Sequence, residues 1–303
     1  MYLATFLHDG QLKFGFRTKD ENSIVDAAAA EKQFFPHPLL PETLREVIEN
    51  QEAVARLREL NNEISENSAN YIVPLSEVTL QAPLPDPKRD IICLGLNYHE
   101  HALEYTTAME EAKNVPQYPI VFSKATTAVI GTNQEIKSHR NVTNQIDYEA
   151  ELAIVIGKEG TNISEEEAYD YILGYTIIND VTARDLQKKH SQWFLGKGLD
   201  TFGPMGPYLV TADEIPAPVH LNIQCRVNGE VRQNSNTELL IFDIPTIIKT
   251  VSAGITLQPG DIIATGTPKG VGIGFQPPRF LQEGDIVEVE IEKIGVLTNT
   301  VAN

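Results

Sequence analysis

Residues 147–157, DYEAELAIVIG, combine two acidic side chains with a strongly apolar run. Glu149 and Glu151 are two positions apart, so on a strand both side chains leave the same face, with Cα atoms roughly 6.5 Å apart. The residues that follow are apolar on both faces, which predicts a buried strand. Because an unpaired buried charge is costly, a bound cation would explain the two carboxylates. The alternative is that both glutamates lie on a solvated strand end.

A second apolar strand, GYTIIND, ends in Asp180. If the chain turns helical there, Arg184 and Gln187 lie four and seven residues further on and share the face of Asp180. One acid, one cation and one amide would then point at a common spot. A competing interpretation makes Thr182 a helix N-cap with Asp185 at the third helical position, and both arrangements can hold at once.

The acidic residues Glu149, Glu151 and Asp180 are the predicted metal ligands. A site built from carboxylates without cysteine selects a hard ion, which favours Mg²⁺ or Mn²⁺ and argues against zinc. Such a site usually keeps water molecules that a substrate can displace.

A histidine and a glutamate follow the strand-like run IICLGL. On a helix His101 and Glu104 are i,i+3 neighbours, so the carboxylate can orient the imidazole and raise its basicity. The pair could activate a water molecule, although His-x-x-Glu also occurs by chance on many solvated helices. His99 together with His101 could suggest zinc, but no third nitrogen or sulfur ligand accompanies them.

Glycines are concentrated in TGTPKGVGIGF, residues 265–275, directly after the strand-like run DIIATG. They let the backbone approach a ligand, and consecutive N–H groups can form an anion-binding nest. The run lacks the Gly-Lys-Ser/Thr ending of a nucleotide P-loop, and an ordinary hairpin would also explain it.

The composition is that of a globular protein with a strong negative charge. The 303 residues are 42% hydrophobic and carry a net charge of −18, which repels nucleic acid and anionic membrane surfaces. No run approaches 18 apolar residues and the start lacks a secretory leader, so we expect a soluble, cytoplasmic protein. Cys93 and Cys225 lie in apolar strand-like runs, which predicts buried free thiols and a reducing compartment.

A proline-rich joint, APLPDPKRD at 82–90, divides the chain into two predicted units. Before the joint we expect two short strands around the turn Asp9-Gly10 and a helix from about Glu42 to Ile64. The predicted domains are therefore a small N-terminal α+β domain over residues 1–80 and a catalytic domain over residues 81–303.

Strand-like runs dominate the second unit. A helix is expected over EEEAYDYIL, between Ser164 as N-cap and Gly174 as terminator. The Asn-Gly pair in VNGE, residues 227–230, predicts a two-residue hairpin turn. The predicted fold class is α+β, mainly β, with a rolled or sandwiched sheet.

Seven stretches in this order resemble the fumarylacetoacetate hydrolase superfamily over about residues 88 to 303. They are LGLNYHEHALE, FSKATTAVIG, DYEAELAIVIGK, GYTIINDVTARDLQ, GKGLDTFGPMGP, VNGEVRQ and LQPGDIIATGTPKGVG. The resemblance implies a mixed β-sandwich roll, usually homodimeric, with Mg²⁺ or Mn²⁺ on the three acidic residues. It also implies that His101 and Glu104 lie on a mobile lid that closes over the substrate.

The same resemblance implies roles for further residues. Arg184, Gln187 and Lys197 would contact substrate or water, with Lys197 grouped with the histidine and glutamate as catalytic. Thr267 would bind the substrate carboxylate, and Lys124 matches the family's lysine in the FSK stretch. The N-terminal 80 residues, QKKHSQWFLGKGLDTFGPMGP and FQPPRFLQEGD make the chain look similar to the bacterial subgroup that includes oxaloacetate decarboxylases.

These residues predict cleavage of a carbon–carbon bond in a small anionic 2-oxo acid through a metal-bound enolate. Oxaloacetate decarboxylation to pyruvate and CO₂ ranks first. Hydrolysis of a fumarylpyruvate- or fumarylacetoacetate-type acylpyruvate, with water delivered by His101 and Glu104, ranks second. A 2-hydroxyhepta-2,4-diene-1,7-dioate isomerase would reprotonate a related enolate elsewhere. A non-enzymatic alternative is an interaction protein that reuses the fold.

Overall fold

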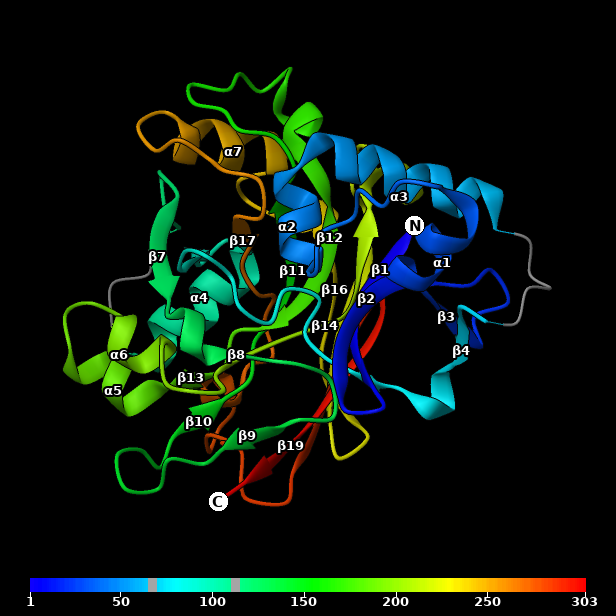
Figure 1. Ribbon diagram of the computed structural model, residues 1–303. Helices are drawn as coiled ribbons and strands as arrows, with labels where there is room; N and C mark the ends of the chain where they lie inside the picture. The colour runs from blue at the N-terminus through cyan, green and yellow to red at the C-terminus, as the bar shows by residue number, and fades with distance from the viewer. Residues whose placement is uncertain (65–69, 110–114) are drawn as a thin grey trace.

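Two sheets form the framework of the protein, whose computed structural model describes residues 1–64, 70–109 and 115–303 (Figure 1). The large sheet has twelve strands among the described residues, and β5 and β8 lie beside its main path. In spatial order its strands are β4 (Ile72–Pro74), β3 (Ser23–Asp26), β2 (Gln11–Arg17), β1 (Tyr2–His8), β14 (Gly203–Thr211), β12 (Ile172–Asn179), β11 (Ala150–Ile156), β17 (Ile262–Ala264), β6 (Ile91–Gly95) and β7 (Ile120–Lys124), with β5 (Thr79–Leu80) on β1 and β8 (Val129–Ile130) on β14.

A five-stranded sheet packs against the large one, and a short pair of strands lies apart. The five strands are β16 (Glu230–Asn236), β15 (Asn222–Val227), β18 (Ile286–Ile291), β19 (Gly295–Ala302) and β9 (Glu135–Lys137), and the pair is β10 (Ile146–Asp147) with β13 (Thr182–Ala183). The α-helices are α1 (Ala27–Phe34), α2 (Leu44–Glu49), α3 (Gln51–Glu63), α4 (His99–Ala108), α5 (Arg184–Lys189), α6 (Phe194–Lys197) and α7 (Ile244–Ser252). The predicted class, α+β and mainly β, is confirmed.

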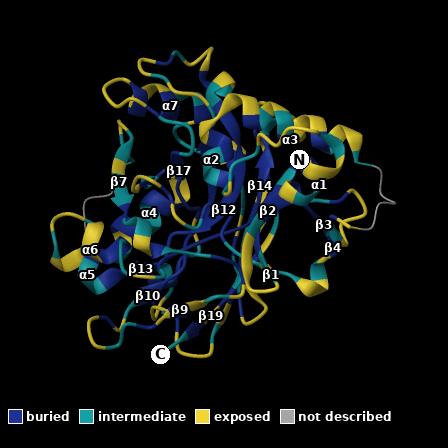
Figure 2. Ribbon diagram, viewed as in Figure 1, coloured by how far each residue is buried: buried dark blue, intermediate teal, exposed yellow. Residues whose placement is uncertain are grey.

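The central strand β11 is buried on both faces, as its apolar run predicted. Leu152, Ile154 and Ile156 belong to the core between the two sheets, whereas Ala153 and Val155 belong to the core beneath the N-terminal helices. Because side chains alternate along a strand, one run serves two cores. Figure 2 shows this buried interior, with exposed residues on the helices and loops around it.

The N-terminal strands join the large sheet, because β1 pairs antiparallel with β14. The Asp9-Gly10 turn between β1 and β2 is confirmed, with φ angles of 50° and 73°. The division into domains near residue 80 stays a prediction, since strands from both sides of it share one sheet. The expected helix from Glu42 to Ile64 is instead two helices, α2 and α3. Asn50 separates them in an extended conformation and caps the second helix through its side chain.

The helix expected between Ser164 and Gly174 is wrong. Ser164 accepts the N–H of Glu167 at 3.3 Å, as a cap would, but only a short 3₁₀ turn follows, and β12 begins at Ile172. Pairing of the β-prone residues with β11 and β14 outweighs the local helix signal. The hairpin at Asn228 and Gly229 is confirmed between β15 and β16.

Two smaller expectations concern the cysteines and membrane insertion. Cys93 and Cys225 are buried free thiols, as predicted. Within the described ranges, no helix has the length and apolar character needed to cross a membrane.

Candidate active site

Three carboxylates converge where β11 begins and β12 ends. The strands are antiparallel with Ala150 opposite Asn179, so Glu149, Glu151 and Asp180 meet at one edge. Their side chains offer ligand atoms that all lie within 4.8 Å of one another, and all three residues are buried. The predicted convergence is confirmed. A buried triad of this kind fits a divalent cation with a preference for oxygen ligands.

Three buried cations surround this triad and neutralise two of its members. Lys197 Nζ lies 2.7 Å from both Glu149 Oε2 and Asp180 Oδ2. Lys124 Nζ lies 2.7 Å from Asp180 Oδ1, and Arg184 Nη2 lies 2.7 Å from Glu149 Oε1. Burial raises the pKa of Glu149, but the charges of Lys197 and Arg184 outweigh this and lower it to about 2. Glu149 is therefore held as a carboxylate.

Glu151 is the member of the triad that lacks such a partner. Its carboxylate accepts the N–H of Gly266 at 2.8 Å, and no lysine or arginine in the described ranges forms an ion pair with it. Burial raises its pKa well above the ordinary value, and the charges of Asp180 and Glu149 raise it further. A divalent cation would remove this cost, so the donor set and its charge both fit the predicted metal.

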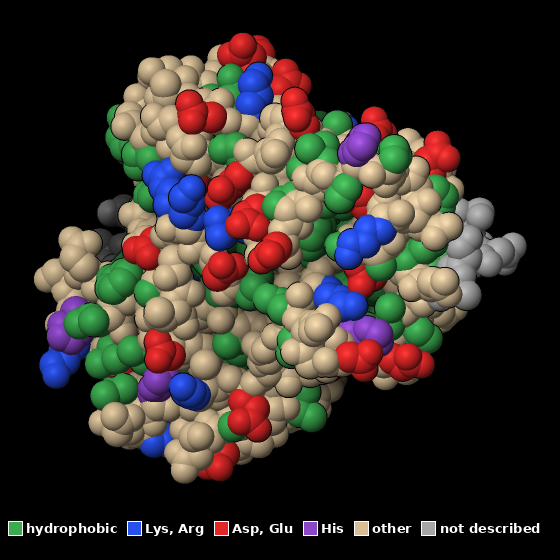
Figure 3. Space-filling view, in the orientation of Figure 1, with side chains coloured by type: hydrophobic (Ala, Val, Ile, Leu, Met, Phe, Trp, Pro, Cys, Tyr) green, Lys and Arg blue, Asp and Glu red, His purple; other side chains and the backbone are tan. Residues whose placement is uncertain are grey.

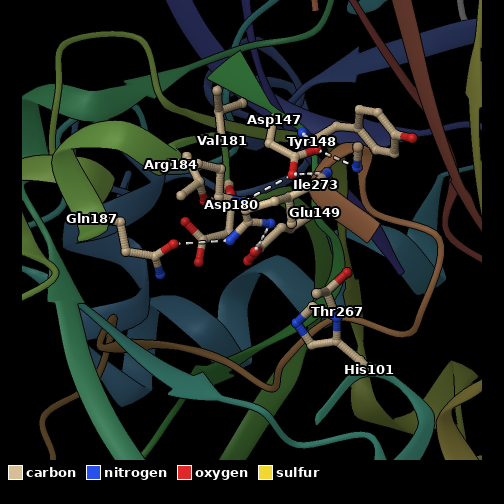
Figure 4. A network of polar contacts seen from close by, with 12 residues as sticks. His101, Asp147, Tyr148, Glu149, Asp180, Val181, Arg184, Gln187, Thr267 and Ile273 are labelled. Atoms are coloured by element: carbon tan, nitrogen blue, oxygen red, sulfur yellow. Dashed lines mark hydrogen bonds and ion pairs between the residues drawn. The ribbon is translucent and has the colours of Figure 1, made fainter. Parts of the chain in front are cut away.

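A fourth carboxylate, Asp147, was missed by the sequence reasoning. It is fully buried, accepts Arg184 Nε at 2.8 Å, and binds the N–H groups of Gly272 at 2.6 Å and Ile273 at 3.0 Å (Figure 4). Asp147 thus fixes both the arginine and the glycine run. Its position two residues before Glu149 in DYEAE was the available signal.

The helix after Asp180 differs in detail from the prediction. It begins at Arg184, and Thr182 is not its N-cap, because the Thr182 hydroxyl donates to the carbonyl of Asp180 at 2.9 Å. Asp185 instead accepts a hydrogen bond from Thr143 and so anchors a different loop. Arg184 nevertheless reaches the triad, and its Nη1 donates to the side-chain oxygen of Gln187 at 3.1 Å.

The histidine and glutamate form the expected pair on α4. His101 Nδ1 lies 3.3 Å from Glu104 Oε2, and Glu104 also accepts the N–H of Gly270 at 3.1 Å. His101 lines the same cavity as Thr267, whose hydroxyl accepts a hydrogen bond from Gln233. Backbone N–H groups of the glycine run, residues 265–275, therefore bind the carboxylates of Glu104 and Asp147.

Residues 110–114 of the expected lid lie outside the described residues, so the mobility of the lid stays a prediction.

The order of these motifs and the geometry they build agree with one known family. Residues 90–302 match the family described as fumarylacetoacetate (FAA) hydrolase C-terminal. The chain belongs to the fumarylacetoacetate hydrolase family.

Relatives of this family member cover nearly its whole length. It is 48% identical over 286 residues to a protein named oxaloacetate tautomerase YisK from Bacillus subtilis, covering 93% of this chain and 94% of the relative. A fumarylacetoacetate hydrolase structure from Exiguobacterium antarcticum is 39% identical, with a TM-score of 0.81 and coverage of 100% and 99%. Maleylpyruvate hydrolase from Sphingobium sp., solved with manganese(II) and pyruvate, is 29% identical, with a TM-score of 0.75 and coverage of 100% and 99%. None of these three proteins is named as a decarboxylase, which is the activity that the sequence analysis ranked first.

The active-site cavity is small, with a volume of about 10 Å³, which is room for about one water molecule. Its lining combines two members of the triad with cationic, polar and aromatic side chains. The lining residues are Leu94, Gly95, Leu96, His101, Tyr105, Phe122, Glu149, Glu151, Arg184, Gln187, Trp193, Lys197 and Thr267. Lys124 is not among them. Its ammonium donates to Asp180 Oδ1 and to the carbonyls of Val181 and Lys197, so its predicted contact with substrate stays a prediction.

A larger cavity of about 770 Å³ lies elsewhere, between α2 and the turn before β17. The two arginines that line it form ion pairs within the protein. Arg45 Nη1 lies 3.0 Å from Glu49 Oε1, and Arg89 Nη1 lies 2.7 Å from Asp261 Oδ2. On the face shown in Figure 3, lysine and arginine side chains lie among aspartates and glutamates. The smaller cavity, in contrast, is lined by Glu149 and Glu151 of the buried triad and is the candidate site.

Proposed function

We propose that this protein is a metal-dependent enzyme that interconverts the keto and enol forms of oxaloacetate. The observation that carries the proposal is the buried triad beside Lys197 and Arg184, in which Glu151 forms no ion pair with any lysine or arginine that the structure describes. The name of the Bacillus subtilis relative, an oxaloacetate tautomerase, supports the choice of substrate and reaction.

Mg²⁺ or Mn²⁺ held by Glu149, Glu151 and Asp180 would polarise the 2-oxo group of the substrate and stabilise the enolate charge. The manganese in the maleylpyruvate hydrolase structure supports this pair of metals. Arg184 and Lys197 would hold the anionic substrate, in a protein whose overall charge of −18 offers an anion little other attraction.

We assign the proton transfer to His101, which lines the cavity together with Glu149 and Glu151. Tautomerisation breaks the C3–H bond and forms an O–H bond at the 2-oxo oxygen, so one group must accept and return a proton. Glu104 engages His101 Nδ1, which leaves Nε2 as the nitrogen that can exchange a proton with C3. Thr267 lines the same cavity as His101 and can donate its hydroxyl to a substrate carboxylate.

The charge of the site also explains why an anion would bind only with metal. Lys124, Arg184 and Lys197 are balanced by Asp147, Glu149 and Asp180, so without metal no positive charge is left over to hold an anion. A divalent cation supplies that charge. Burial of Glu151 without an ion-pair partner among the described residues also counts against a non-enzymatic protein that merely reuses the fold, because such a buried carboxyl group is costly without a ligand.

Decarboxylation of oxaloacetate to pyruvate and CO₂ is the second candidate, because loss of CO₂ leaves an enolate on the same residues. Acylpyruvate hydrolysis and diene-dioate isomerisation would use the same triad, and the His101–Glu104 contact is the observation that favours activation of a water molecule for hydrolysis.

A homodimer is proposed from the family resemblance, and light scattering would test it.

One experiment separates these reactions. Enol-rich oxaloacetate is mixed with the protein and Mn²⁺, Mg²⁺ or a chelator, and enol loss is followed by ultraviolet absorbance while pyruvate is measured with lactate dehydrogenase. Faster enol loss without pyruvate supports a tautomerase, whereas pyruvate in equal amount supports a decarboxylase. His101→Ala should abolish the acceleration, and His99→Ala, an exposed neighbour on α4, should not. No acceleration with either metal would refute the proposal.

A further inference from the structure

Three aromatic side chains close the cavity on one side. Trp193 lies 5.3 Å from Phe122 and 6.1 Å from Tyr105, measured between ring centroids, and all three line the cavity. Lys197 Nζ lies 4.9 Å from the centre of the Phe122 ring, so the aromatic wall begins directly beside the charged groups that would hold the substrate.

Trp193 fills a space that the sequence leaves for it. A Cβ atom at Gly95 would lie 2.5 Å from Cζ3 of the indole, so β6 accepts the ring only because residue 95 has no side chain. On its other side the indole packs against a small apolar cluster that includes Tyr105 and Ile273. The ring is therefore fixed by packing on two sides.

The position of Trp193 in the chain links it to the site. It lies between α5, which carries Arg184 and Gln187, and α6, which ends at Lys197. Its carbonyl accepts the N–H of Lys197 at 3.0 Å. Unlike Tyr105, which is buried, Trp193 is half-buried, so its indole stands between the cavity and solvent.

We propose that Trp193 is a specificity-determining residue, whose indole confines the substrate to short 2-oxo acids and excludes those with a large group beyond the oxo carbon. The inference rests on the proposed function, because it assumes that a 2-oxo acid occupies this cavity. Because the rings of Trp193, Phe122 and Tyr105 line the cavity together with Lys197 and Arg184, a bulky group beyond the oxo carbon would meet this aromatic wall. Replacing Trp193 by alanine is the change that would open the cavity on this side.

The test compares binding of pyruvate and phenylglyoxylate, two 2-oxo acids that differ by a methyl and a phenyl group, by calorimetry with Mn²⁺. The wild-type protein should prefer pyruvate, and Trp193→Ala should reduce that preference at least tenfold, since one misfitted methylene alone is worth about 10- to 200-fold. Trp193→Phe should lie between them. Phe194→Ala, on the exposed neighbour in α6, should leave the preference unchanged.

A second measurement tests the packing without any ligand. Gly95→Ala should lower the melting temperature of the wild-type protein through its clash with the indole, and should lower that of the Trp193→Ala variant much less. An equal loss of melting temperature in the wild-type protein and in the Trp193→Ala variant would contradict the packing of the indole against Gly95. Unchanged ligand preference in a Trp193→Ala variant that still binds Mn²⁺ would overturn the proposed specificity alone. Failure of both acids to bind the wild-type protein with Mn²⁺ would overturn the proposed function as well.

Discussion

Two members of the carboxylate triad, Asp180 and Glu151, should affect the stability of the protein in opposite ways when their charge is removed. Asp180→Asn and Glu151→Gln should both abolish metal binding, because each takes one anionic ligand from a three-carboxylate site. Their effects on the metal-free protein should differ, since Asp180 is paired with two buried lysines and Glu151 is bound by the N–H of Gly266.

The expected magnitudes follow from those contacts. Asp180→Asn leaves Lys124 and Lys197 buried with a weakened partner, and breaking a buried ion pair costs about 3–5 kcal/mol. Glu151→Gln keeps an oxygen that can accept the N–H of Gly266 and removes a charge that repels Glu149 and Asp180. We expect the free energy of unfolding to rise, because the variant no longer buries a carboxyl group whose pKa is raised by burial and by the neighbouring carboxylates.

The pH dependence of this difference has a definite sign. A carboxyl group whose pKa is raised by folding binds a proton in the folded state that the unfolded chain releases above about pH 4.3. Its contribution therefore makes stability fall as the pH rises from that value towards the raised pKa. The advantage of Glu151→Gln over the wild-type protein should grow through this range and then level off.

Urea unfolding followed by circular dichroism, in the presence of a chelator and again with Mn²⁺, measures both effects. The exposed Glu159→Gln, just beyond β11, is a matched control that should change neither quantity. If Glu151→Gln destabilised the metal-free protein as much as Asp180→Asn does, the assignment of an uncompensated charge to Glu151 would be wrong.

Three further predictions concern the surroundings of the triad. Asp147→Asn should lower the free energy of unfolding by about 3–5 kcal/mol and weaken oxalate binding, because Arg184 loses its buried partner. Urea unfolding and calorimetry measure the two effects, and an unchanged oxalate affinity would contradict the role of Asp147 in positioning Arg184. Lys197→Ala should weaken Mn²⁺-dependent binding of oxalate about tenfold or more, and calorimetry showing equal affinity would exclude its contact with the anion. The backbone of α4 should gain hydrogen-exchange protection when oxalate binds with Mn²⁺, and equal protection with and without oxalate would refute a lid that carries His101.

The sequence predicted the triad because its signal is local. Spacing of two on an apolar strand placed Glu149 and Glu151 on one face, and a strand ending in Asp180 supplied the third ligand. The geometry needed one further fact, the antiparallel pairing of Ala150 with Asn179, which brings the two strand ends together. Spacing alone cannot show which strand pairs with which.

Other features failed because distant contacts decide them. Strand pairing overrode the helix signal after Ser164, and Asn50 divided a helix whose apolar spacing looked continuous. Asp147 escaped notice because its partners, Arg184 and the N–H groups near Gly272, are far away in sequence. As a single aromatic residue, Trp193 carries no signal in the sequence. Its place in the aromatic wall of the cavity depends on its contact with Gly95, which lies far away in the sequence.

Metal and substrate should bind this site in a coupled way, and the charges set the direction of the coupling. Without metal the charges of Lys124, Arg184 and Lys197 are already balanced by buried carboxylates, so a dicarboxylate finds no excess of positive charge. With a divalent cation the excess becomes positive, and oxalate should bind more tightly than pyruvate because its two anionic oxygens imitate the enolate. Linkage then requires oxalate to tighten Mn²⁺ by the same factor by which Mn²⁺ tightens oxalate. Calorimetric titrations in both orders measure the two factors. Oxalate binding that is indifferent to Mn²⁺ would mean that the cluster recognises anions without metal, and the enolate chemistry proposed for it would fall.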